Sequence, residues 1–380
     1  MSERVPLCKP GFGKEELKRI GEVLESGWLA HGPRVKEFEE KFAGYIGAKY
    51  AVSLNSCASA LQAAIMAKSL KGEIILPSFT FPASANAIVN AGCVPVFADI
   101  EKDTMNISPE DIMKKINHNT VGIMPVHFAG LSCKMDKIME IATNHDLTVI
   151  EDSAEAIGST YQSKKTGSFD IGCFSFYPTK NITTGEGGMI TTNDEKIAEN
   201  ARTIRGHGVK KGAFEREKLD KPWIRVSVMP GYNFRMNEIS AVLGLTQLKK
   251  LDRFNEKRRE NAKYLSKGLS RYKQITVPSE PEDAYHVYQM YVIQVSESVD
   301  RDNFVIFLRN NNVEASVHFE PPVHLHPYYM NEYKCREGDL PITENVAKRV
   351  VTLPMFPSMT KKQMDKIIVT ICKALEKCKQ

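Results

Sequence analysis

The segment Cys173-Phe-Ser-Phe-Tyr-Pro-Thr-Lys180-Asn-Ile-Thr-Thr-Gly-Glu-Gly-Gly188 is the strongest single indication of the fold. It begins as an apolar strand, passes through a lysine and ends in a turn rich in glycine. Glycine allows a backbone to approach a ligand closely. Lys180 therefore lies where a Schiff base could form, although a surface lysine in a loop is the alternative for this residue taken alone.

Outward from this segment, short apolar runs alternate with helical patterns over residues 50–195. This alternation is typical of a parallel sheet with helices on its faces. We therefore predict an α/β fold with a mainly parallel seven-stranded sheet. We expect strands at 50–54, 73–76, 94–98, 121–127, 148–151, 172–176 and 189–192, and helices at 59–70, 83–90, 109–116 and 135–144.

The second half of the chain has a different pattern. Residues 203–230 are rich in Gly, Lys and Glu and have the length of a functional loop or a dimer element. A long amphipathic helix is predicted at 237–269. We place a domain boundary inside it, which gives a large domain, 1–250, whose segment 1–30 lies near the site, and a small α+β domain, 251–380. In the small domain we expect strands at 288–295 and 314–319 and helices at 301–310 and 361–377.

Composition excludes several classes of protein. The formal net charge is +5, and its densest basic stretch, residues 249–259, is predicted to be a solvated helix face rather than a nucleic-acid patch. No apolar run approaches a membrane span and the first residues lack the apolar region of a secretory signal, so we expect no membrane contact and a cytoplasmic location.

Cysteine and histidine spacing gives no sign of a metal centre. The eight cysteines form no CxxC pair, so we expect most of them to be reduced and buried. The closest histidines, His318, His324 and His326, fit no zinc motif. We predict no bound metal.

Three further elements complement Lys180. Asp152 ends a buried strand, where it could hold a protonated ring nitrogen or simply cap a following helix. Ala58 and Ser59 open a helix whose free N–H groups could bind a phosphate, although both residue types are also ordinary at helix starts. Phe81 could stack on a ring or belong to the core. Together, a lysine, a carboxylate and a helix end are the parts needed to hold pyridoxal phosphate.

These residues resemble the DegT/DnrJ/EryC1/StrS family, the sugar aminotransferases of the aspartate aminotransferase superfamily, with the PLP-dependent transferase fold of type I. The resemblance covers essentially the whole chain. Seven ordered motifs carry it: Ser26-Gly-Trp28 with Gly32-Pro33 and Phe38-Glu39, Asn55-Ser-Cys-Ala-Ser-Ala-Leu61, Pro77-Ser-Phe-Thr-Phe81, Glu151-Asp-Ser-Ala-Glu155, Phe174-Ser-Phe-Tyr-Pro-Thr-Lys180, Gly185-Glu-Gly-Gly188 and Gly231-Tyr-Asn-Phe-Arg-Met236.

The resemblance implies catalytic roles for two residues. Lys180 matches the lysine that binds pyridoxal 5'-phosphate covalently and, once displaced by an amino substrate, carries a proton between that substrate and the cofactor. Asp152 matches the acid paired with the pyridinium nitrogen, which makes the ring an electron sink. The dehydratase branch of the family has histidine in place of the lysine, so transamination is favoured here.

The resemblance also implies how the rest of the cofactor is bound. Phe81 matches the aromatic residue that stacks on the ring, Ala58 and Ser59 match the phosphate-binding turn, and Ser175 matches a serine that bonds the phosphate. Asn233 matches an asparagine that reaches the phosphate from the neighbouring subunit. The expected active unit is therefore a homodimer with shared active sites.

Two positions depart from the commoner pattern of the family. Ala58 stands where many members have threonine, so a backbone N–H must replace a hydroxyl contact. Glu155 stands where many members have His or Gln near the cofactor's phenolic oxygen. A carboxylate beside a phenolate repels it unless one of them holds a proton, so we expect Glu155 to be either protonated or turned away.

The activity implied by the resemblance is transfer of an amino group from L-glutamate, which becomes 2-oxoglutarate, to a nucleotide-linked keto-sugar. We favour a 4-keto-6-deoxy-hexose, aminated for polysaccharide, lipopolysaccharide or glycan biosynthesis. His318, in segment 317–324, is the candidate substrate contact, with a structural histidine as the alternative. Arg205 and Arg235 could each bind an anionic group or form an ordinary salt bridge.

Other activities remain possible at this point. A 3-keto sugar or a cyclitol ketone could be the acceptor, and the protein could be a regulatory relative that has lost catalysis. A lyase or desulfurase of the same fold type is a further alternative, and a desulfurase would need a reactive cysteine on a mobile loop.

Overall fold

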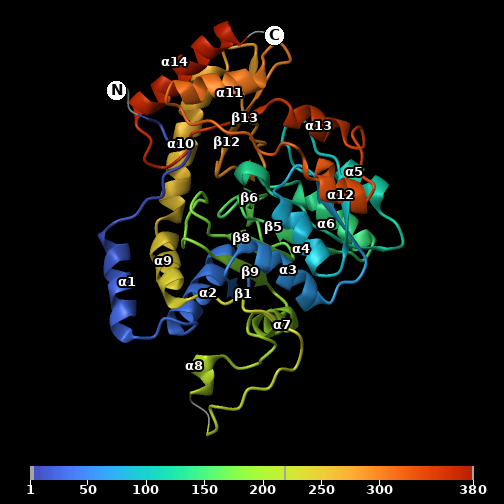
Figure 1. Cartoon of the computed structure of the whole chain (residues 1–380), viewed down its shortest axis with the longest axis vertical. Coiled ribbons are helices and arrows are strands. Elements are labelled where there is room, and N and C mark those ends of the chain that lie inside the picture. Colours follow the sequence, from blue (N-terminus) through green and yellow to red (C-terminus); the bar gives the residue numbers. More distant parts are fainter. Residues whose placement is uncertain (1–3, 218–219, 379–380) are drawn as a thin grey trace.

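The computed structural model describes residues 4–217 and 220–378 (Figure 1). Three predicted segments are therefore described only in part. The N-terminal segment lacks residues 1–3, the stretch 203–230 lacks residues 218–219, and the C-terminal domain lacks residues 379–380.

The seven predicted strands form one sheet in the order β1-β9-β8-β5-β4-β2-β3. β9 is antiparallel to both of its neighbours, and the other adjacent pairs are parallel. The predicted mainly parallel sheet is thus confirmed. The strands are β1 Tyr50–Leu54, β2 Glu73–Pro77, β3 Val94–Ala98, β4 Thr120–Ile123, β5 Thr148–Asp152, β8 Ile171–Ser175 and β9 Gly188–Thr192.

Helices cover both faces of this sheet because successive strand residues point to opposite faces. Val52 and Leu54 of β1 pack against α3, α4 and α7, whereas Ala51, the residue before Val52, packs against α2 and α9. Farther along the sheet, α5 and α6 cover this second face. The helices are α1 Lys14–Ser26, α2 Pro33–Ile46, α3 Cys57–Lys68, α4 Pro82–Asn90, α5 Pro109–Lys115, α6 Met135–Asn144, α7 Glu195–Arg205, α8 Ala213–Arg216 and α9 Glu238–Leu248.

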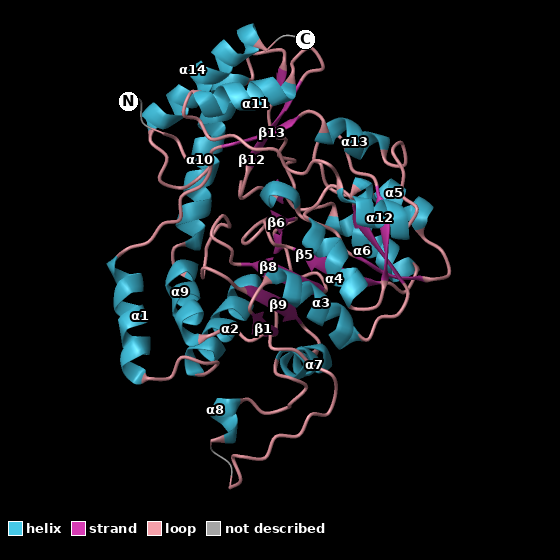
Figure 2. Ribbon diagram, in the orientation of Figure 1, coloured by secondary structure: helices cyan, strands magenta, loops and turns pink. Residues whose placement is uncertain are grey.

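The C-terminal part has its own core around an antiparallel sheet of order β10-β12-β13, covered by α10, α11 and α14 (Figure 2). Helices α12 and α13 follow in the same part of the chain, but they lie beside the helices of the large domain (Figure 1). A third small sheet has the order β11-β6-β7. The elements are β6 Thr160–Tyr161, β7 Lys164–Lys165, α10 Leu251–Leu269, β10 Ile275–Thr276, β11 Ala284–Tyr285, β12 Tyr291–Val295, α11 Arg301–Asn310, α12 Pro327–Glu332, α13 Pro341–Ala347, β13 Val350–Leu353 and α14 Lys361–Lys377.

The prediction of one helix over 237–269 is wrong, because the chain forms two helices, α9 and α10, that meet at Lys249 and Lys250. The two helices serve different cores: Leu245 packs with the large sheet, and Leu265 packs with the small one. At the junction Lys250 pairs with Glu16 of α1. We propose that this junction is the domain boundary, between residues 250 and 251.

The predicted strand at 314–319 is also wrong. Within this fully described segment Ser316 forms a single isolated bridge with Thr352. Beyond it Val317 and Phe319 pack into a cluster around Phe79. This packing draws the chain off the small sheet and toward the carboxyl ends of the large one.

The basic stretch 249–259 is only partly a solvated face. Arg258 is buried, and its Nη1 donates to the carbonyl oxygens of Tyr288, Gln289 and Met355 at 3.0–3.2 Å. Burial lowers the pKa of Arg258 to about 10. This residue ties α10 to the segments that enter and leave the small sheet.

The described residues of the stretch 206–232, which include α8, form an arm that projects from the body of the molecule (Figure 1). The base of this arm is fixed by a bridge between Gly206 and Asn233 and by the Tyr232 N–H, which donates to the Ile204 carbonyl oxygen at 2.7 Å. Its apolar side chains Trp223 and Val226 are 70% and 63% exposed. In the described part of the chain, no helix has the length and apolar composition that crossing a bilayer requires.

Candidate active site

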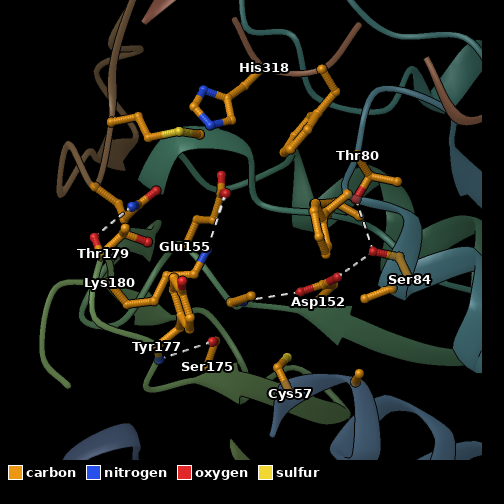
Figure 3. A pocket seen from close by; sticks show the side chains of 18 of the residues that line it. Cys57, Thr80, Ser84, Asp152, Glu155, Ser175, Tyr177, Thr179, Lys180 and His318 are labelled. Atoms are coloured by element: carbon orange, nitrogen blue, oxygen red, sulfur yellow. Dashed lines mark hydrogen bonds and ion pairs between the residues drawn. The ribbon is translucent and has the colours of Figure 1, made fainter. Parts of the chain in front are cut away.

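A cavity of about 530 Å³ opens at the carboxyl ends of the parallel strands, beneath segment 317–319 (Figure 3). Open α/β sheets bind their ligands at this edge. Most of the predicted site residues line this one cavity: Ala58, Phe81, Asp152, Glu155, Ser175, Lys180 and His318.

Lys180 lies in the connection from β8 to β9, and its Nζ is 3.3 Å from Oε1 of Glu155. The other carboxylate oxygen of Glu155 accepts the Ala129 N–H at 2.8 Å. Both side chains are largely buried, at 15% and 10% exposed. Glu155 is therefore turned toward the lysine and paired with it, an arrangement that the sequence did not indicate.

Asp152 is the last residue of β5 and is 5% exposed. Its Oδ2 accepts the hydroxyl of Ser84 at 2.7 Å, and its Oδ1 accepts the Ala154 N–H at 3.1 Å. Burial raises the pKa of Asp152, and the bonds from Ser84 and Ala154 and the charge of Lys180 oppose that rise. A buried carboxylate held in this way is suited to a cationic partner in the cavity.

The start of α3 forms one end of the cavity. The Ser56 side chain caps this helix by accepting the Ser59 N–H at 3.1 Å. Helix geometry leaves the N–H groups of Cys57 and Ala58 without intrahelical acceptors, so they can bind an anion. A Cβ added at Gly188 would lie 2.1 Å from the Ser56 carbonyl oxygen, so glycine is required where β9 passes this helix start.

Ser175 supplies a hydroxyl at the same end of the cavity. Its Oγ accepts the Tyr177 N–H at 3.3 Å, which leaves the hydroxyl proton available for a ligand. Ser59, by contrast, is not among the residues that line the cavity. Its hydroxyl donates to Oδ1 of Asn55 at 2.8 Å, within the cap of α3.

Aromatic side chains and His318 form the opposite wall. Phe81, just before α4, is 63% exposed and its ring centroid lies 6.4 Å from that of Phe319. His318 shares a hydrogen bond of 2.8 Å between Nδ1 and the Thr352 hydroxyl. Burial lowers the pKa of His318, with Glu155 acting in the opposite direction. The imidazole is therefore neutral at pH 7 and can accept or donate a hydrogen bond at Nε2.

Two other candidates lie outside this cavity. Asn233 is exposed, and its Oδ1 accepts the Arg235 Nε–H at 3.0 Å. Arg205 is buried and forms a salt bridge with Glu39. Of the two roles considered for Arg205, the structure gives it the salt bridge.

The lining of the cavity fits pyridoxal phosphate by the chemistry of its donor groups. Three kinds of group line the cavity. Lys180 supplies a primary amine, Asp152 supplies a buried carboxylate, and the start of α3 at Ala58 supplies backbone N–H groups next to the Ser175 hydroxyl. They complement a carbonyl, a ring cation and a phosphate, respectively.

Residues 10–372 match the model of the DegT/DnrJ/EryC1/StrS aminotransferase family. The chain belongs to this family. Its members depend on pyridoxal phosphate, so the chain is a pyridoxal phosphate-dependent sugar aminotransferase. When bound, the cofactor supplies an electron sink for the charge left as the amino-bearing carbon loses its proton.

Relatives of this family member match over nearly their whole lengths. The spore coat polysaccharide biosynthesis protein SpsC of Bacillus subtilis is 41% identical, with 97% of this chain and 96% of SpsC covered. Helicobacter pylori PseC, an aminotransferase involved in pseudoaminic acid biosynthesis, superposes with a TM-score of 0.92 at 30% identity, covering 99% and 100% of the two chains. The PLP form of Spr1654 from Streptococcus pneumoniae gives 0.91 at 26% identity, with 99% of each chain covered.

The sequence did not single out Ser84, Thr80 or Gln289, which also line the cavity. Thr80 stands in the Pro77–Phe81 motif, and Ser84 follows that motif by three residues in α4, which is the signal that could have drawn attention to them. The bond from Ser84 to Asp152 joins elements far apart in the chain, so no local pattern reveals it. Gln289 lies just before β12, and its side-chain amide donates to the Thr179 carbonyl oxygen at 2.9 Å.

Proposed function

We propose that this aminotransferase moves the amino group of L-glutamate to a nucleotide-linked 4-keto-6-deoxy-hexose, making an amino sugar for polysaccharide, lipopolysaccharide or glycan biosynthesis. The observation that carries the proposal is the intact catalytic set, in which Lys180, paired with Glu155, shares one cavity with Asp152. The names of SpsC and PseC support a role in polysaccharide or sugar biosynthesis.

In this proposal Lys180 and Asp152 are the catalytic residues. Lys180 would hold the cofactor through the cofactor's carbonyl carbon, and its amine, once freed by the amino donor, would take up the proton from the amino-bearing carbon. Asp152 remains ionised against the ring nitrogen. Its two hydrogen bonds, from Ser84 and Ala154, support that state in a buried position.

The cofactor phosphate is assigned to the start of α3. The N–H groups of Cys57 and Ala58 and the Ser175 hydroxyl would bind it. Ser59 contributes through the helix cap, because its own N–H and hydroxyl are bonded within the cap. Phe81, with an exposed ring beside the cavity, would stack on the cofactor ring.

For the sugar, we propose His318 as the polar contact and the adjoining apolar wall as the place of the deoxy carbon. His318 lines the same cavity as Glu155 and Lys180 (Figure 3), so a hydroxyl or carbonyl bonded to it would share the cavity with the reacting amine. Phe319 and Met290 line the cavity beside it and would accommodate a methyl group better than a hydroxymethyl group.

We further propose a homodimer with shared active sites. The arm 206–232 exposes Trp223, Ile224, Val226 and Val228, a set of apolar side chains that a monomer would leave in water. Asn233, at the base of this arm, is exposed and does not line its own cavity, and we propose that its amide group enters a neighbouring one. A protein with Asn233→Ala mixed with one carrying Lys180→Ala would regain activity in mixed dimers if sites are shared.

The cysteines argue against a desulfurase. Cys57, at the first position of α3, would normally gain thiolate character from the helix start. Burial instead raises its pKa well above the usual value, and Asp152 adds to the rise. Burial also raises the pKa of Cys8, which lines the same cavity. All eight cysteines are free thiols, which supports our proposal of a cytoplasmic location.

The test begins with absorption spectra of the purified protein with pyridoxal phosphate, before and after glutamate. Conversion of the visible band of the lysine-bound cofactor into the near-ultraviolet band of the pyridoxamine form would establish the donor half reaction. A panel of 4-keto and 3-keto nucleotide sugars and a cyclitol ketone would then identify the acceptor. Turnover of a 3-keto sugar or the cyclitol alone would reject the 4-keto proposal, and no spectral response to any amino donor would favour a regulatory relative.

A further inference from the structure

A chain of buried hydroxyls leads to the catalytic carboxylate (Figure 3). Thr80 Oγ1 lies 2.9 Å from Ser84 Oγ, and Ser84 Oγ lies 2.7 Å from Oδ2 of Asp152. Thr80 and Ser84 are 2% and 1% exposed, so water does not replace these contacts. The three residues come from the connection after β2, from α4 and from β5.

The direction of the hydrogen bonds follows from the acceptor at the end of the chain. An ionised carboxylate only accepts, so Ser84 must donate to Asp152, and Thr80 must then donate to Ser84. If Asp152 were protonated, the whole chain could reverse. The two arrangements differ in strength, because hydrogen bonds to a charged group are the stronger kind, so the chain of hydroxyls favours the ionised form of Asp152.

We propose that Ser84 is a positioning residue for transamination, whose hydroxyl, ordered by Thr80, keeps Asp152 ionised and oriented toward the cation that the cofactor brings. The inference rests on the role of Asp152 in the proposed function. It adds a requirement that neither the family motif nor the reaction states, namely that this carboxylate depends on a donor from α4.

Other charged or titratable groups around Asp152 must be weighed in any effect of pH. They are Lys180 from the β8–β9 connection, Glu155 from the segment after β5, Cys57 from α3 and Cys173 from β8. Burial raises the pKa of both thiols, so they are neutral at pH 7, and Lys180 and Glu155 pair with each other. The remaining influences are the two hydrogen-bond donors, Ser84 and the Ala154 N–H, and of these only Ser84 is a side chain that a substitution can remove.

The experiment measures the affinity of the full-length apoprotein for pyridoxal phosphate by equilibrium dialysis between pH 5.5 and 9. Ser84→Ala removes the donor, Ser84→Thr restores a hydroxyl, and Thr80→Val removes the second hydroxyl with little change in shape. Ser153→Ala is the matched control, because the buried Ser153 hydroxyl beside Asp152 has no hydrogen-bond partner among the described residues. The melting temperature of each apoprotein reports the fold separately.

In Ser84→Ala, Asp152 should take up its proton at a higher pH, so the loss of affinity on acidification should begin at a higher pH. We expect about tenfold weaker binding at pH 7, with recovery toward the wild-type value at pH 9. Ser84→Thr should resemble the wild type, Thr80→Val should shift the profile by about two- to threefold, and Ser153→Ala should leave it unchanged.

An unmoved pH profile in Ser84→Ala, or a loss of affinity equal at every pH, would overturn the inference. If Ser84→Ala does not fold, Thr80→Val decides between the same two outcomes. Because pyridoxal phosphate itself titrates in this range, Asp152→Asn supplies the profile without the carboxylate. If the affinity of Asp152→Asn depends on pH as that of the wild type does, the proposed role of Asp152 is wrong. If Asp152→Asn differs from the wild type while Ser84→Ala does not, only the inference about Ser84 is wrong.

Discussion

The buried acid–base pairs Lys180–Glu155 and Arg205–Glu39 differ in what surrounds them. Lys180 and Glu155 are 15% and 10% exposed, and Arg205 and Glu39 are 7% and 9% exposed. Burial alone hardly separates them. Arg205 Nη1 donates to Glu39 and to the Ser53 carbonyl oxygen and hydroxyl, while Glu39 accepts the Ser53 N–H at 2.8 Å.

The difference lies in bonding capacity that is left unused. The Arg205–Glu39 pair is surrounded by donors and acceptors of its own chain, so it has no room for a ligand. The amine of Lys180 makes one contact at 3.3 Å and faces a cavity. We therefore propose that the pair with an unsaturated group next to open space, Lys180–Glu155, is the functional one, and that the saturated pair Arg205–Glu39 stabilises the fold.

The largest effect should come from Lys180→Ala. Transamination should fall by about a thousandfold or more, because the group that binds the cofactor and moves the proton is gone. The melting temperature should stay within a few degrees of the wild type, since the lysine faces a cavity. Exposed Lys196 on α7 provides the control substitution, Lys196→Ala, which should leave both values unchanged. Activity near the wild-type level in Lys180→Ala would refute the assignment.

Glu39→Gln should show the opposite pattern. Removing this charge leaves the buried Arg205 guanidinium without an anionic partner, which costs about 3–5 kcal/mol of unfolding free energy. Urea unfolding monitored by circular dichroism measures the loss, and protein that remains folded should retain its turnover number. A small stability change with a large loss of turnover would mean that the two pairs had been assigned the wrong way round.

Acid should weaken the structural pair through His31, whose Nε2 lies 3.1 Å from Arg205 Nη2. Burial, followed by the charge of Arg205, lowers the pKa of His31 to about 4. Between that value and the ordinary one the unfolded chain binds more protons, so stability rises with pH and falls on acidification. We expect this histidine to lower the unfolding free energy by about 2–3 kcal/mol between pH 7.5 and pH 4.5.

The measurement compares the wild type with His31→Gln, which keeps an acceptor for Arg205 but cannot take up the proton. The wild type should lose more stability than the variant over this pH range. Parallel curves for the two proteins would show that His31 is not held neutral by its surroundings.

Much of the fold followed from periodicity in the sequence. The strands of the large sheet alternate with helices in the chain, and each is a short apolar run that burial on two faces requires, as in β5. The break between α9 and α10 was missed because apolar spacing continues through Lys249 and Lys250. The chain breaks there because α9 and α10 pack into two different cores, and contacts of that kind depend on the tertiary structure rather than on local spacing.

The sequence indicated the residues whose own side chain would carry the chemistry. It did not indicate the residues that act by pairing with another side chain. Lys180 and Asp152 were identifiable because their types and strand-end positions match the cofactor's needs. The pairing of Glu155 with Lys180, anchored by Ala129, and the bond from Ser84 to Asp152 join distant segments. No spacing rule reports such contacts. Ser59 was predicted to contact the phosphate because it belongs to the matching motif, but its N–H and its hydroxyl are both bonded within the cap of α3.

Glu155→Gln makes the same chemical change in the cavity that Glu39→Gln makes in the structural pair, and it should have the smallest effect on stability. The amide still accepts the Ala129 N–H, and Lys180 borders a cavity that can admit water, so the unfolding free energy should change by less than about 1 kcal/mol. Transamination should fall by about tenfold, because the charge that orients the Lys180 amine is lost; removing a proton-transfer group itself costs more. Urea unfolding and steady-state rates on the same preparation give both values. If Glu155→Gln destabilises the protein as much as Glu39→Gln does, unused bonding capacity is not what separates the two pairs, and the cavity lysine would be as structural as the arginine.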